Sequence, residues 1–273
     1  MAEFDERGFV RIAGAFPKDE AARMCERLWD ELARRHGVRQ DDPATWTVEQ
    51  PSHFQALRRS GTFEAIASPV LTEMLDDLLG AGAWLRPDHW GDSLVTFPDT
   101  RAAWDVPHAG WHIDWPPRGA ARPLFGCKVL AFVSPVAAGG GGTVLLAGSH
   151  RLVECAVAAS RSGAAGHSPA LRKTLGAAHP WLHDLWSRPT GGDRIARFMR
   201  DGAVLDDVDL RVVELTGAAG DAVVFHPWLF HAAAPNRARG PRMMVGQNVQ
   251  TTSGIARYAM RERAERAASR PRT

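Results

Sequence analysis

The chain has 273 residues and a formal net charge of +2, from 33 basic and 31 acidic side chains. That length allows one large domain or two small ones, with a substantial buried core. So small a net charge gives no global field pointing to nucleic acid or an anionic membrane, and we expect a small-molecule partner. Arg outnumbers Lys by 30 to 3 but is scattered along the chain, which indicates coding bias rather than an anion-binding patch.

Cysteine usage and the first residues bear on the compartment. Cys25, Cys127 and Cys155 are an odd number at long spacings, with no CxxC pair and no disulfide framework. The opening MAEFDERGFV is charged where a secretory signal would be apolar, and no run reaches the roughly 18 apolar residues of a membrane span. We therefore expect a cytoplasmic protein.

Two helices are predicted in the N-terminal part. The run GFVRIAGAF alternates like a strand, and Pro17 then precedes a segment with apolar residues at helical spacing that ends at Gly37. Pro69 begins a second amphipathic segment that ends before Gly80. Residues 38–61 between them show little periodicity. Both helices are expected to cover a sheet.

From Trp84 onward the sequence changes to short runs suited to strands, separated by turn-rich stretches. The predicted strands are Ser93–Phe97, Lys128–Ser134, Thr143–Leu146, Arg211–Leu215, Ala222–Phe225 and Met243–Val249. Strands this short and numerous, mostly without helices between them, favour an antiparallel sandwich or barrel over a parallel sheet.

Two segments fall outside this pattern. Residues 151–205 hold Trp181, Trp186 and many Arg, read as helix and loop, and are too long for an ordinary hairpin connection. We predict that this insertion is a lid or cap. The tail, about residues 256–273, is predicted to be a charged, fraying helix. We expect a single domain over residues 1–273 that includes both segments.

The run GWHIDW carries the first candidate metal ligands. His112 and Asp114 lie two residues apart, and in an extended segment such residues project from the same face. A second histidine from a distant strand would complete one face of a metal site and leave the other positions open. That arrangement suits Fe(II) that must bind a cosubstrate and O2. An isolated His-x-Asp is usually a solvated pair and not a metal site. Residues further along the chain therefore decide whether this pair is interpreted as metal ligands.

Two histidines near the C-terminal end are candidates for the third ligand. His226 and His231 both lie in the run FHPWLFHAAAPNRARGPR. Arg242 follows His231 by eleven residues, across a turn that contains Pro, Asn and Gly. A hairpin of that length would place Arg242 on the neighbouring strand, where its planar guanidinium grips a carboxylate bidentately.

Taken together, these elements resemble the phytanoyl-CoA dioxygenase family of iron- and 2-oxoglutarate-dependent oxygenases. The resemblance spans nearly the whole chain. It rests on the opening GFVRIAGAF, the His-x-Asp pair, the segment GGTVLLAGSHR and the run HAAAPNRARGPR. It implies a mainly β (α+β) fold, a double-stranded β-helix (jelly roll) flanked by N-terminal helices, with a helical and loop insertion.

The resemblance also implies residue roles. His112, Asp114 and His231 would be the catalytic iron ligands, and Arg242 would pair with the distal carboxylate of 2-oxoglutarate. The spacing to Arg242 favours His231, so we interpret His226 as a histidine that closes a strand. The expected cofactors are Fe(II), 2-oxoglutarate and O2.

Some positions depart from the family's usual pattern. Ala233 stands where relatives often have a Ser that helps to hold the cosubstrate, and Leu130 stands where some have a Trp. We assign a secondary cosubstrate contact to Thr143 instead. His108 precedes His112 by four residues, a helical metal spacing, but the surrounding PHAGW is turn-like and indicates a loop or pocket residue. The His of the GSH run is expected to fix its loop by hydrogen bonding.

The candidate substrate contacts each have an alternative interpretation. Trp115 is interpreted as a residue at the rim of the site, with core packing as the alternative. Trp181, Trp186 and Arg188 of the predicted cap are the other candidates, and the Arg content of the cap indicates a substrate with a carboxylate, phosphate or similar anionic group. A solvated basic face is the alternative interpretation of these Arg residues.

The implied activity is oxidation of a small metabolite, with release of succinate and CO2. An intact Asp114 favours hydroxylation, because relatives that halogenate have a small residue there. Desaturation, ring formation and epimerisation use the same ligands. A non-catalytic jelly-roll binding protein and a 2-oxoglutarate-dependent protein or peptide hydroxylase are the alternatives. Neither the substrate nor the oligomeric state follows from the sequence.

Overall fold

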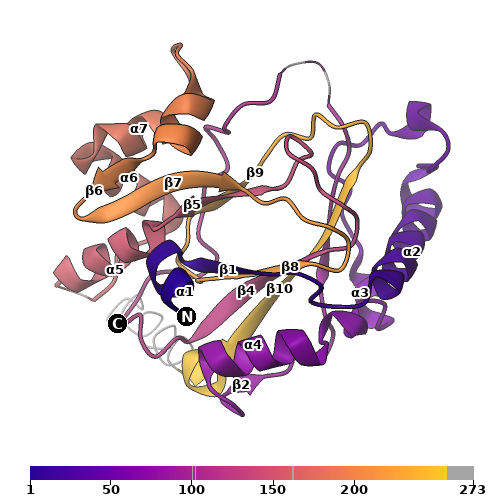
Figure 1. The fold of residues 1–273 in the computed structure, drawn as a ribbon, viewed down its shortest axis with the longest axis horizontal. Coiled ribbons are helices and arrows are strands. Elements are labelled where there is room, and N and C mark those ends of the chain that lie inside the picture. The colour runs from indigo at the N-terminus through magenta and orange to yellow at the C-terminus, as the bar shows by residue number, and fades with distance from the viewer. Residues whose placement is uncertain (100, 102, 162, 257–273) are drawn as a thin grey trace, which may run out of the picture.

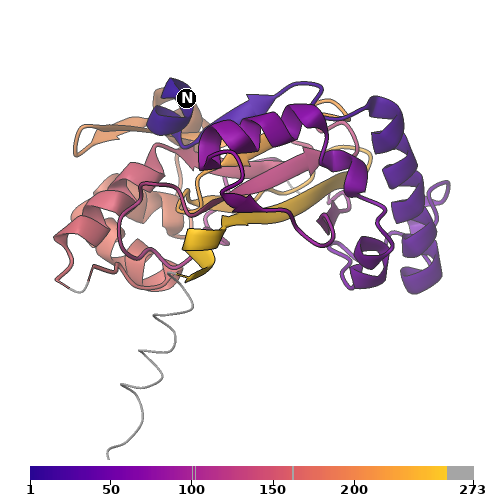
Figure 2. The same ribbon diagram turned by 90° about the horizontal axis from the view of Figure 1, so that it is seen from below.

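Two antiparallel sheets pack face to face at the centre of the structure, and helices group at both ends of this sandwich (Figures 1 and 2). The computed structural model describes residues 1–99, 101, 103–161 and 163–256. The tail predicted at about residues 256–273 therefore lies almost entirely outside the described residues. The architecture is the predicted jelly roll with flanking helices.

The larger sheet consists of β1 (Phe9–Ile12), β2 (Trp84–Leu85), β3 (Asp92–Thr96), β4 (Gly126–Phe132), β8 (Ala222–Phe225) and β10 (Arg242–Thr251). Its order is β1-β8-β4-β10-β2, and β3 also pairs with β10. The smaller sheet consists of β5 (Thr143–Ala147), β6 (Ala203–Leu205), β7 (Val208–Glu214) and β9 (His231–Ala233). Its order is β6-β7-β5-β9. Each of the six strands predicted after Trp84 overlaps one of these strands.

One predicted connection is wrong. Arg242 was expected on the strand next to that of His231, but β9 pairs with β5 in the smaller sheet and β10 pairs with β3 and β4 in the larger one. The intervening residues cross from one sheet to the other and do not form a hairpin. The amide of Asn236, which is buried, donates to the carbonyls of Thr96 and Gly240, both at 2.9 Å, and holds this crossing in place.

The sequence of β4 explains why the central strands are apolar on both faces. Cys127 and Val129 pack with the N-terminal helices, whereas Leu130 and Phe132 pack in the cluster between the two sheets. Because both faces are buried, the alternation of a half-exposed strand is lost. The same period of two puts Lys128 on the inner face with Leu130 and Phe132.

The two predicted N-terminal helices cover the outer face of the larger sheet. They are α2 (Lys18–His36) and α4 (Pro69–Leu79), and their apolar stripes share one buried cluster with that sheet. Ser68 caps α4 by accepting a hydrogen bond from the Leu71 amide at 3.2 Å. Shorter helical segments complete this part: α1 (Ala2–Arg7), α3 (Gln55–Arg59) and the 3₁₀ turns Pro43–Thr45 and Glu64–Ile66.

The predicted insertion is helical and packs on the outer face of the smaller sheet. It contains α5 (Ser149–Ala159), α6 (Ser168–Ala178), α7 (Pro180–Trp186) and the π-helix Ala196–Asp201. Its apolar residues share a second cluster with β5 and β7 and with Trp111 and Trp228. Figures 1 and 2 show α5, α6 and α7 together at the end of the sandwich opposite α2.

Within the part of the chain that the structure describes, no helix combines the length and the apolar character needed to cross a membrane.

Candidate active site

The backbones of His112 and His231 are paired, and their side chains lie next to each other. The segment around His112 is an extended loop that forms a single bridge to β9. The amide of each histidine donates to the carbonyl of the other at 2.9 Å. The two imidazole ring centroids lie 4.2 Å apart. Residues from distant parts of the chain are thus held in one fixed register.

The ring nitrogens of both histidines are oriented for metal binding. Nδ1 of His112 lies 2.8 Å from the Gly110 carbonyl, and Nδ1 of His231 lies 3.0 Å from the Leu229 carbonyl. A carbonyl oxygen only accepts, so each Nδ1 carries the proton and each Nε2 keeps its lone pair. Such backbone partners are the usual means of fixing a metal-binding imidazole.

Asp114 completes a three-residue cluster. Its Oδ1 lies 3.8 Å from Nε2 of His112 and 3.6 Å from Nε2 of His231, and all three ligand atoms fall within 4.8 Å of one another. Metal–ligand bonds of about 2.1 Å place neighbouring ligand atoms roughly 3.0–3.6 Å apart, so the three groups would draw closer together around an ion. Among the described residues this is the one His, Cys and carboxylate group close enough to hold a metal.

The electrostatics of the cluster favour an ionised Asp114 carboxylate and a neutral His112 imidazole. Burial opposes the charge of Asp114, but its interactions with the neighbouring His231 and with the Lys128 ammonium outweigh burial and hold the pKa of Asp114 below its usual value. Burial, followed by repulsion from His231, lowers the pKa of His112. These are the protonation states in which Asp114 and His112 act as ligands.

Arg242 lies on the inner face of β10, away from the metal cluster. Its Nη2 donates to Oγ1 of Thr96 on β3 at 2.6 Å, while its Nε is buried without a hydrogen-bond partner among the described residues. Burial lowers the pKa of Arg242 to about 10, so the guanidinium is still charged at neutral pH. A buried cation with an unused donor is a site for an anionic group.

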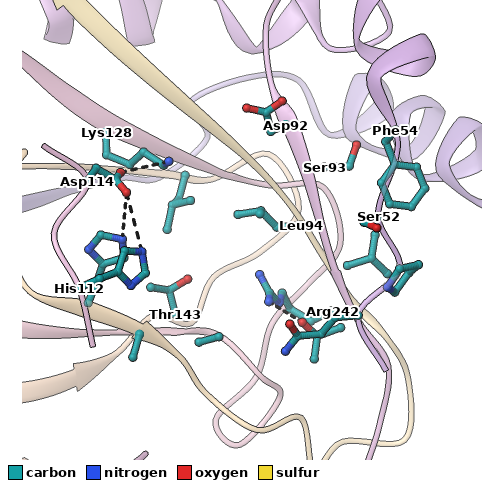
Figure 3. A pocket seen from close by; sticks show the side chains of 18 of the residues that line it. Ser52, Phe54, Asp92, Ser93, Leu94, His112, Asp114, Lys128, Thr143 and Arg242 are labelled. Carbon is teal, nitrogen blue, oxygen red and sulfur yellow. Dashed lines mark hydrogen bonds and ion pairs between the residues drawn. The ribbon is translucent and has the colours of Figure 1, made fainter. Parts of the chain in front are cut away.

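A cavity of about 500 Å³ joins these groups at the open edge between the two sheets. Figure 3 shows His112, Asp114 and Lys128 on one side, Arg242 and Thr143 below, and Ser52, Phe54 and Ser93 on the far side. The residues that line it are residues 50–55, Asp92, Ser93, Leu94, Val95, Thr96, His112, Asp114, Lys128, Leu130, Thr143, Phe225, His231, Ala232, Ala233 and Arg242.

The structure brings some predicted residues to this cavity. Thr143 lines it from β5, opposite Ala233 in the pairing of β5 with β9. Ala233 and Leu130, the two positions that depart from the family's pattern, line it as well. Their small or aliphatic side chains offer no polar contact. Thr143 supplies a hydroxyl group in this part of the wall.

The predicted substrate contacts do not reach the cavity. Trp115 is buried against Phe125, with ring centroids 6.0 Å apart, so its alternative interpretation as a core residue fits the structure. Trp181 packs edge-on against Phe198, and Trp186 packs against the ring of Phe230. These three indoles lie in or against the cluster beneath the smaller sheet rather than in the space between the sheets.

Arg188 lies in a separate surface hollow, with Arg194 and Arg197. No residue of 151–205 lines the cavity, so the expected cap over its mouth is absent from the described residues. The cations that line the cavity are Lys128, which pairs with Asp114, and Arg242, which hydrogen-bonds Thr96 and keeps an unused Nε donor. The Arg residues of the insertion, on which the expectation of an anionic substrate rests, are therefore not among the residues that line the cavity.

The insertion instead supports the segment that carries two of the candidate ligands. Arg172 of α6 donates to the Trp111 carbonyl, and the Ile113 amide donates to Oγ of Ser168 at 3.2 Å. Arg194, which is buried, donates through Nε to the Val106 carbonyl at 3.2 Å. These bonds tie the loop on both sides of His112 to the helices.

The alternative histidines lie elsewhere. His226 is fully buried; its Nδ1 accepts a hydrogen bond from the Trp228 amide at 3.1 Å, and its ring packs 4.9 Å from that of His150. Nε2 of His150 donates to the Asp5 carbonyl at 3.1 Å, which ties the Gly-Ser-His segment to α1. His108 is an exposed loop residue and does not line the cavity.

Sequence reasoning missed several residues that line the cavity. Residues 50–55 form part of its wall although their stretch showed little periodicity. Thr96 and Ser93 lie on a predicted strand but carry no local signal of function. Lys128 did carry one: it is one of three lysines in the chain and interrupts the apolar run GCKVLAF.

A jelly roll whose inner face carries two histidines and a carboxylate beside a buried arginine defines the class of non-haem iron oxygenases that use 2-oxoglutarate. The family model for phytanoyl-CoA dioxygenase (PhyH) matches residues 4–244, and the chain belongs to this family. The protein is a 2-oxoglutarate-dependent non-haem iron oxygenase, with iron and 2-oxoglutarate as cofactor and cosubstrate. No curated protein sequence matches it.

Solved structures share the fold at low sequence identity. The 2-oxoglutarate-dependent epimerase SnoN from nogalamycin biosynthesis is 17% identical, with a TM-score of 0.51, over 92% of this chain and 80% of that one. AviO1 from Streptomyces viridochromogenes Tue57 is 17% identical, with a TM-score of 0.52, over 92% and 93%. EctD from S. alaskensis, solved with 2-oxoglutarate and 5-hydroxyectoine, is 16% identical, with a TM-score of 0.52, over 93% and 75%. Identities this low support the fold alone.

Proposed function

We propose that the protein hydroxylates a small, uncharged molecule rich in hydrogen-bonding groups, with iron held by His112, Asp114 and His231 and 2-oxoglutarate anchored by Arg242. One observation carries the proposal: these four side chains, from three separate parts of the chain, line a single cavity. In the overall reaction a C–H bond of the substrate becomes C–OH, while 2-oxoglutarate and O2 yield succinate and CO2.

The residues present fit an iron ion. Two imidazole Nε2 lone pairs and one carboxylate oxygen converge, and they occupy one face of a coordination sphere whose other positions would open to the cavity. When bound, iron(II) with 2-oxoglutarate supplies the activation of O2 and the oxidative decarboxylation that is coupled to oxidation of the substrate. The retained carboxylate of Asp114 supports hydroxylation over halogenation within the family.

The remaining wall residues hold the cosubstrate and keep water out. Arg242 neutralises the distal carboxylate of 2-oxoglutarate, and Thr96 orients the guanidinium through the 2.6 Å bond to Nη2. Thr143 supplies a further hydroxyl, while Leu130 and Phe225 form the apolar part of the inner wall. A dry, rigid inner wall limits oxidation of the protein in place of the substrate.

The wall of the cavity across from His112 and Asp114 supports the substrate assignment (Figure 3). It is bounded by residues 50–55 and by Asp92 and Ser93, which offer amide, hydroxyl, imidazole and carboxylate groups. Oγ of Ser93 is buried and has no hydrogen-bond partner among the described residues. Asp92 pairs with Arg58 at 3.0 Å, so its charge is already balanced. An uncharged substrate with hydroxyl or carbonyl groups matches this wall.

We propose that residues 1–273 form one domain. In it, residues 151–205 are an insertion whose helices brace the ligand segment through Ser168 and Arg172. Substrate selection is assigned to the wall formed by residues 50–55 and the start of β3.

Succinate formation by the purified protein tests the proposal. The protein is supplied with Fe(II), 2-oxoglutarate and O2 and compared across a panel of neutral polyols, amides and glycosides and a panel of carboxylates and phosphate esters. We expect stimulation by the neutral panel and a hydroxylated product of matching amount. Ser93→Ala should lower this stimulation, whereas Ser187→Ala, outside the cavity, should not. Stimulation by anionic compounds alone would contradict the substrate class, and absence of any succinate would contradict the activity.

A further inference from the structure

Lys128 is the one lysine on the inner face of the sandwich. It lies on β4 between Cys127 and Val129, which point to the helices, so its own side chain points into the space between the sheets. Its Nζ lies 3.1 Å from Oδ2 of Asp114, as Figure 3 shows. The side chain is only 19% exposed.

The backbone around Lys128 leaves room for this arrangement. Gly246 on β10 pairs with Leu130, and a Cβ at that glycine would lie 3.4 Å from Cε of Lys128. A larger residue on β10 would therefore crowd the lysine stem. Glycine at this position therefore leaves space beside the stem of Lys128.

The pairing divides the two oxygens of Asp114 between different partners. Oδ1 faces the Nε2 atoms of His112 and His231, at 3.8 and 3.6 Å, whereas Oδ2 faces the ammonium. Oδ2 is buried and has no hydrogen-bond partner among the described residues; histidines apart, the Lys128 ammonium is the one cationic side chain within ion-pair distance of it there. A mostly buried ammonium needs such a counter-charge, because an unpaired one is costly to bury.

We propose that Lys128 is a positioning residue that holds Asp114 with a single oxygen toward the metal. The inference rests on the proposed iron site. A carboxylate with two free oxygens can bind a metal through both and take up a second coordination position. With Oδ2 engaged by Lys128, one oxygen serves as ligand, and the position that the second would occupy stays available to cosubstrate or O2.

The test compares four forms of the full-length protein. Lys128→Met removes the charge but keeps a flexible stem, and Lys128→Arg keeps the charge. Lys173→Met makes the same chemical change on the exposed surface of α6 and serves as the matched control. Thermal unfolding of each metal-free form checks folding. If Lys128→Met does not fold, Lys128→Gln takes its place.

Two readouts do not depend on turnover. The first is the orientation of Asp114 in metal-free crystals, and the second is the visible absorption band of the anaerobic complex with Fe(II) and 2-oxoglutarate. In Lys128→Met we expect the carboxylate to turn, the band to shift in wavelength, and succinate formation to fall roughly tenfold or more. The 2-oxoglutarate concentration for half-saturation should stay unchanged, because Arg242 is untouched. Lys128→Arg should restore the band and most of the activity.

The outcomes separate this inference from the proposed function. A wild-type protein without any band refutes the iron site itself. A normal wild-type band, together with an unchanged carboxylate and band in Lys128→Met, overturns the role of Lys128 alone. An unchanged carboxylate with a raised substrate requirement also overturns it, and would make Lys128 a substrate contact. Iron affinity by itself does not test the role of Lys128. In Lys128→Met, loss of the Asp114 orientation weakens iron binding, whereas loss of the ammonium that repels the cation strengthens it.

Discussion

His112 and His231 each donate a backbone hydrogen bond to the other at 2.9 Å, so the two candidate ligands are aligned before any metal binds. The imidazoles are aligned as well. Nδ1 of His112 lies at the Gly110 carbonyl and Nδ1 of His231 at the Leu229 carbonyl, and both Nε2 atoms face Asp114. This preorganisation favours His231 as the ligand, because His226 is buried beside His150 with its Nδ1 already engaged by the Trp228 amide.

The first prediction concerns those two histidines. His231→Ala should abolish the visible band of the anaerobic Fe(II) and 2-oxoglutarate complex and all succinate formation. His226→Ala should retain the band but unfold at a lower temperature, because it removes a fully buried ring and a hydrogen-bond acceptor, at a cost of about 2 kcal/mol or more. Both variants are measured by visible absorption and by thermal unfolding. The opposite pattern would make His226 the ligand.

A second prediction concerns Arg242. Arg242→Gln removes the buried charge that faces the distal carboxylate, and losing such a pair costs about 3 kcal/mol, roughly a hundredfold in affinity. The 2-oxoglutarate concentration for half-maximal succinate formation should rise accordingly, while iron binding persists. Arg239→Gln, an exposed position in the same connecting segment, is the control and should behave as wild type. An unchanged requirement in Arg242→Gln would remove this residue from the cosubstrate site.

The third prediction tests the insertion as a brace. Arg172→Met and Ser168→Ala release the loop that carries His112 from α6. We expect each to weaken iron retention roughly tenfold, with no change in the 2-oxoglutarate requirement. Iron content after dialysis is the measurement. Arg188→Met and Trp181→Ala, in the same insertion but away from the loop, should leave both quantities unchanged. If these two instead lower substrate-dependent turnover, the segment selects the substrate after all.

The last prediction is a pH dependence of stability. Burial lowers the pKa of His150 to about 4 from its ordinary 6.5, with further lowering by Arg151 and Arg122. Burial also holds the pKa of His226 well below its ordinary value. The unfolded chain therefore binds more protons than the folded one between pH 6.5 and 4. The free energy of unfolding is therefore highest above pH 6.5 and decreases as the pH falls toward 4.

Urea unfolding of the metal-free protein measures this effect. His150→Gln keeps a donor for the Asp5 carbonyl but does not titrate in this range. The advantage of wild type over His150→Gln should shrink on going from pH 7 to 4, by up to about 3 kcal/mol. His108→Gln, at an exposed loop position, is the control and should track wild type. A pH-independent difference between wild type and His150→Gln would contradict the prediction.

The sequence alone was sufficient for the fold class, most of the strands and the family; the short strands β2 and β6 were not predicted. Apolar runs of strand length bounded by turns are local signals, and His112, Asp114, His231 and Arg242 stand at spacings that can be read from the chain. Arg242 illustrates the limit. Its spacing predicted a role beside the metal site, but the interval was wrongly interpreted as a hairpin. Spacing along the chain does not distinguish a turn within one sheet from a crossing between two.

Only the tertiary structure decided what surrounds the site. Trp115, Trp181 and Trp186 are large and aromatic, which suits a binding wall and a buried core equally well, and packing put them in or against the core. Residues 50–55 have no periodicity, yet their place beside β3 makes them part of the cavity wall. The pairing of Lys128 with Asp114 depends on which face of β4 is turned inward and on which loop lies against it. Such contacts between distant segments leave no pattern within either segment, and they exist only once the two sheets have packed.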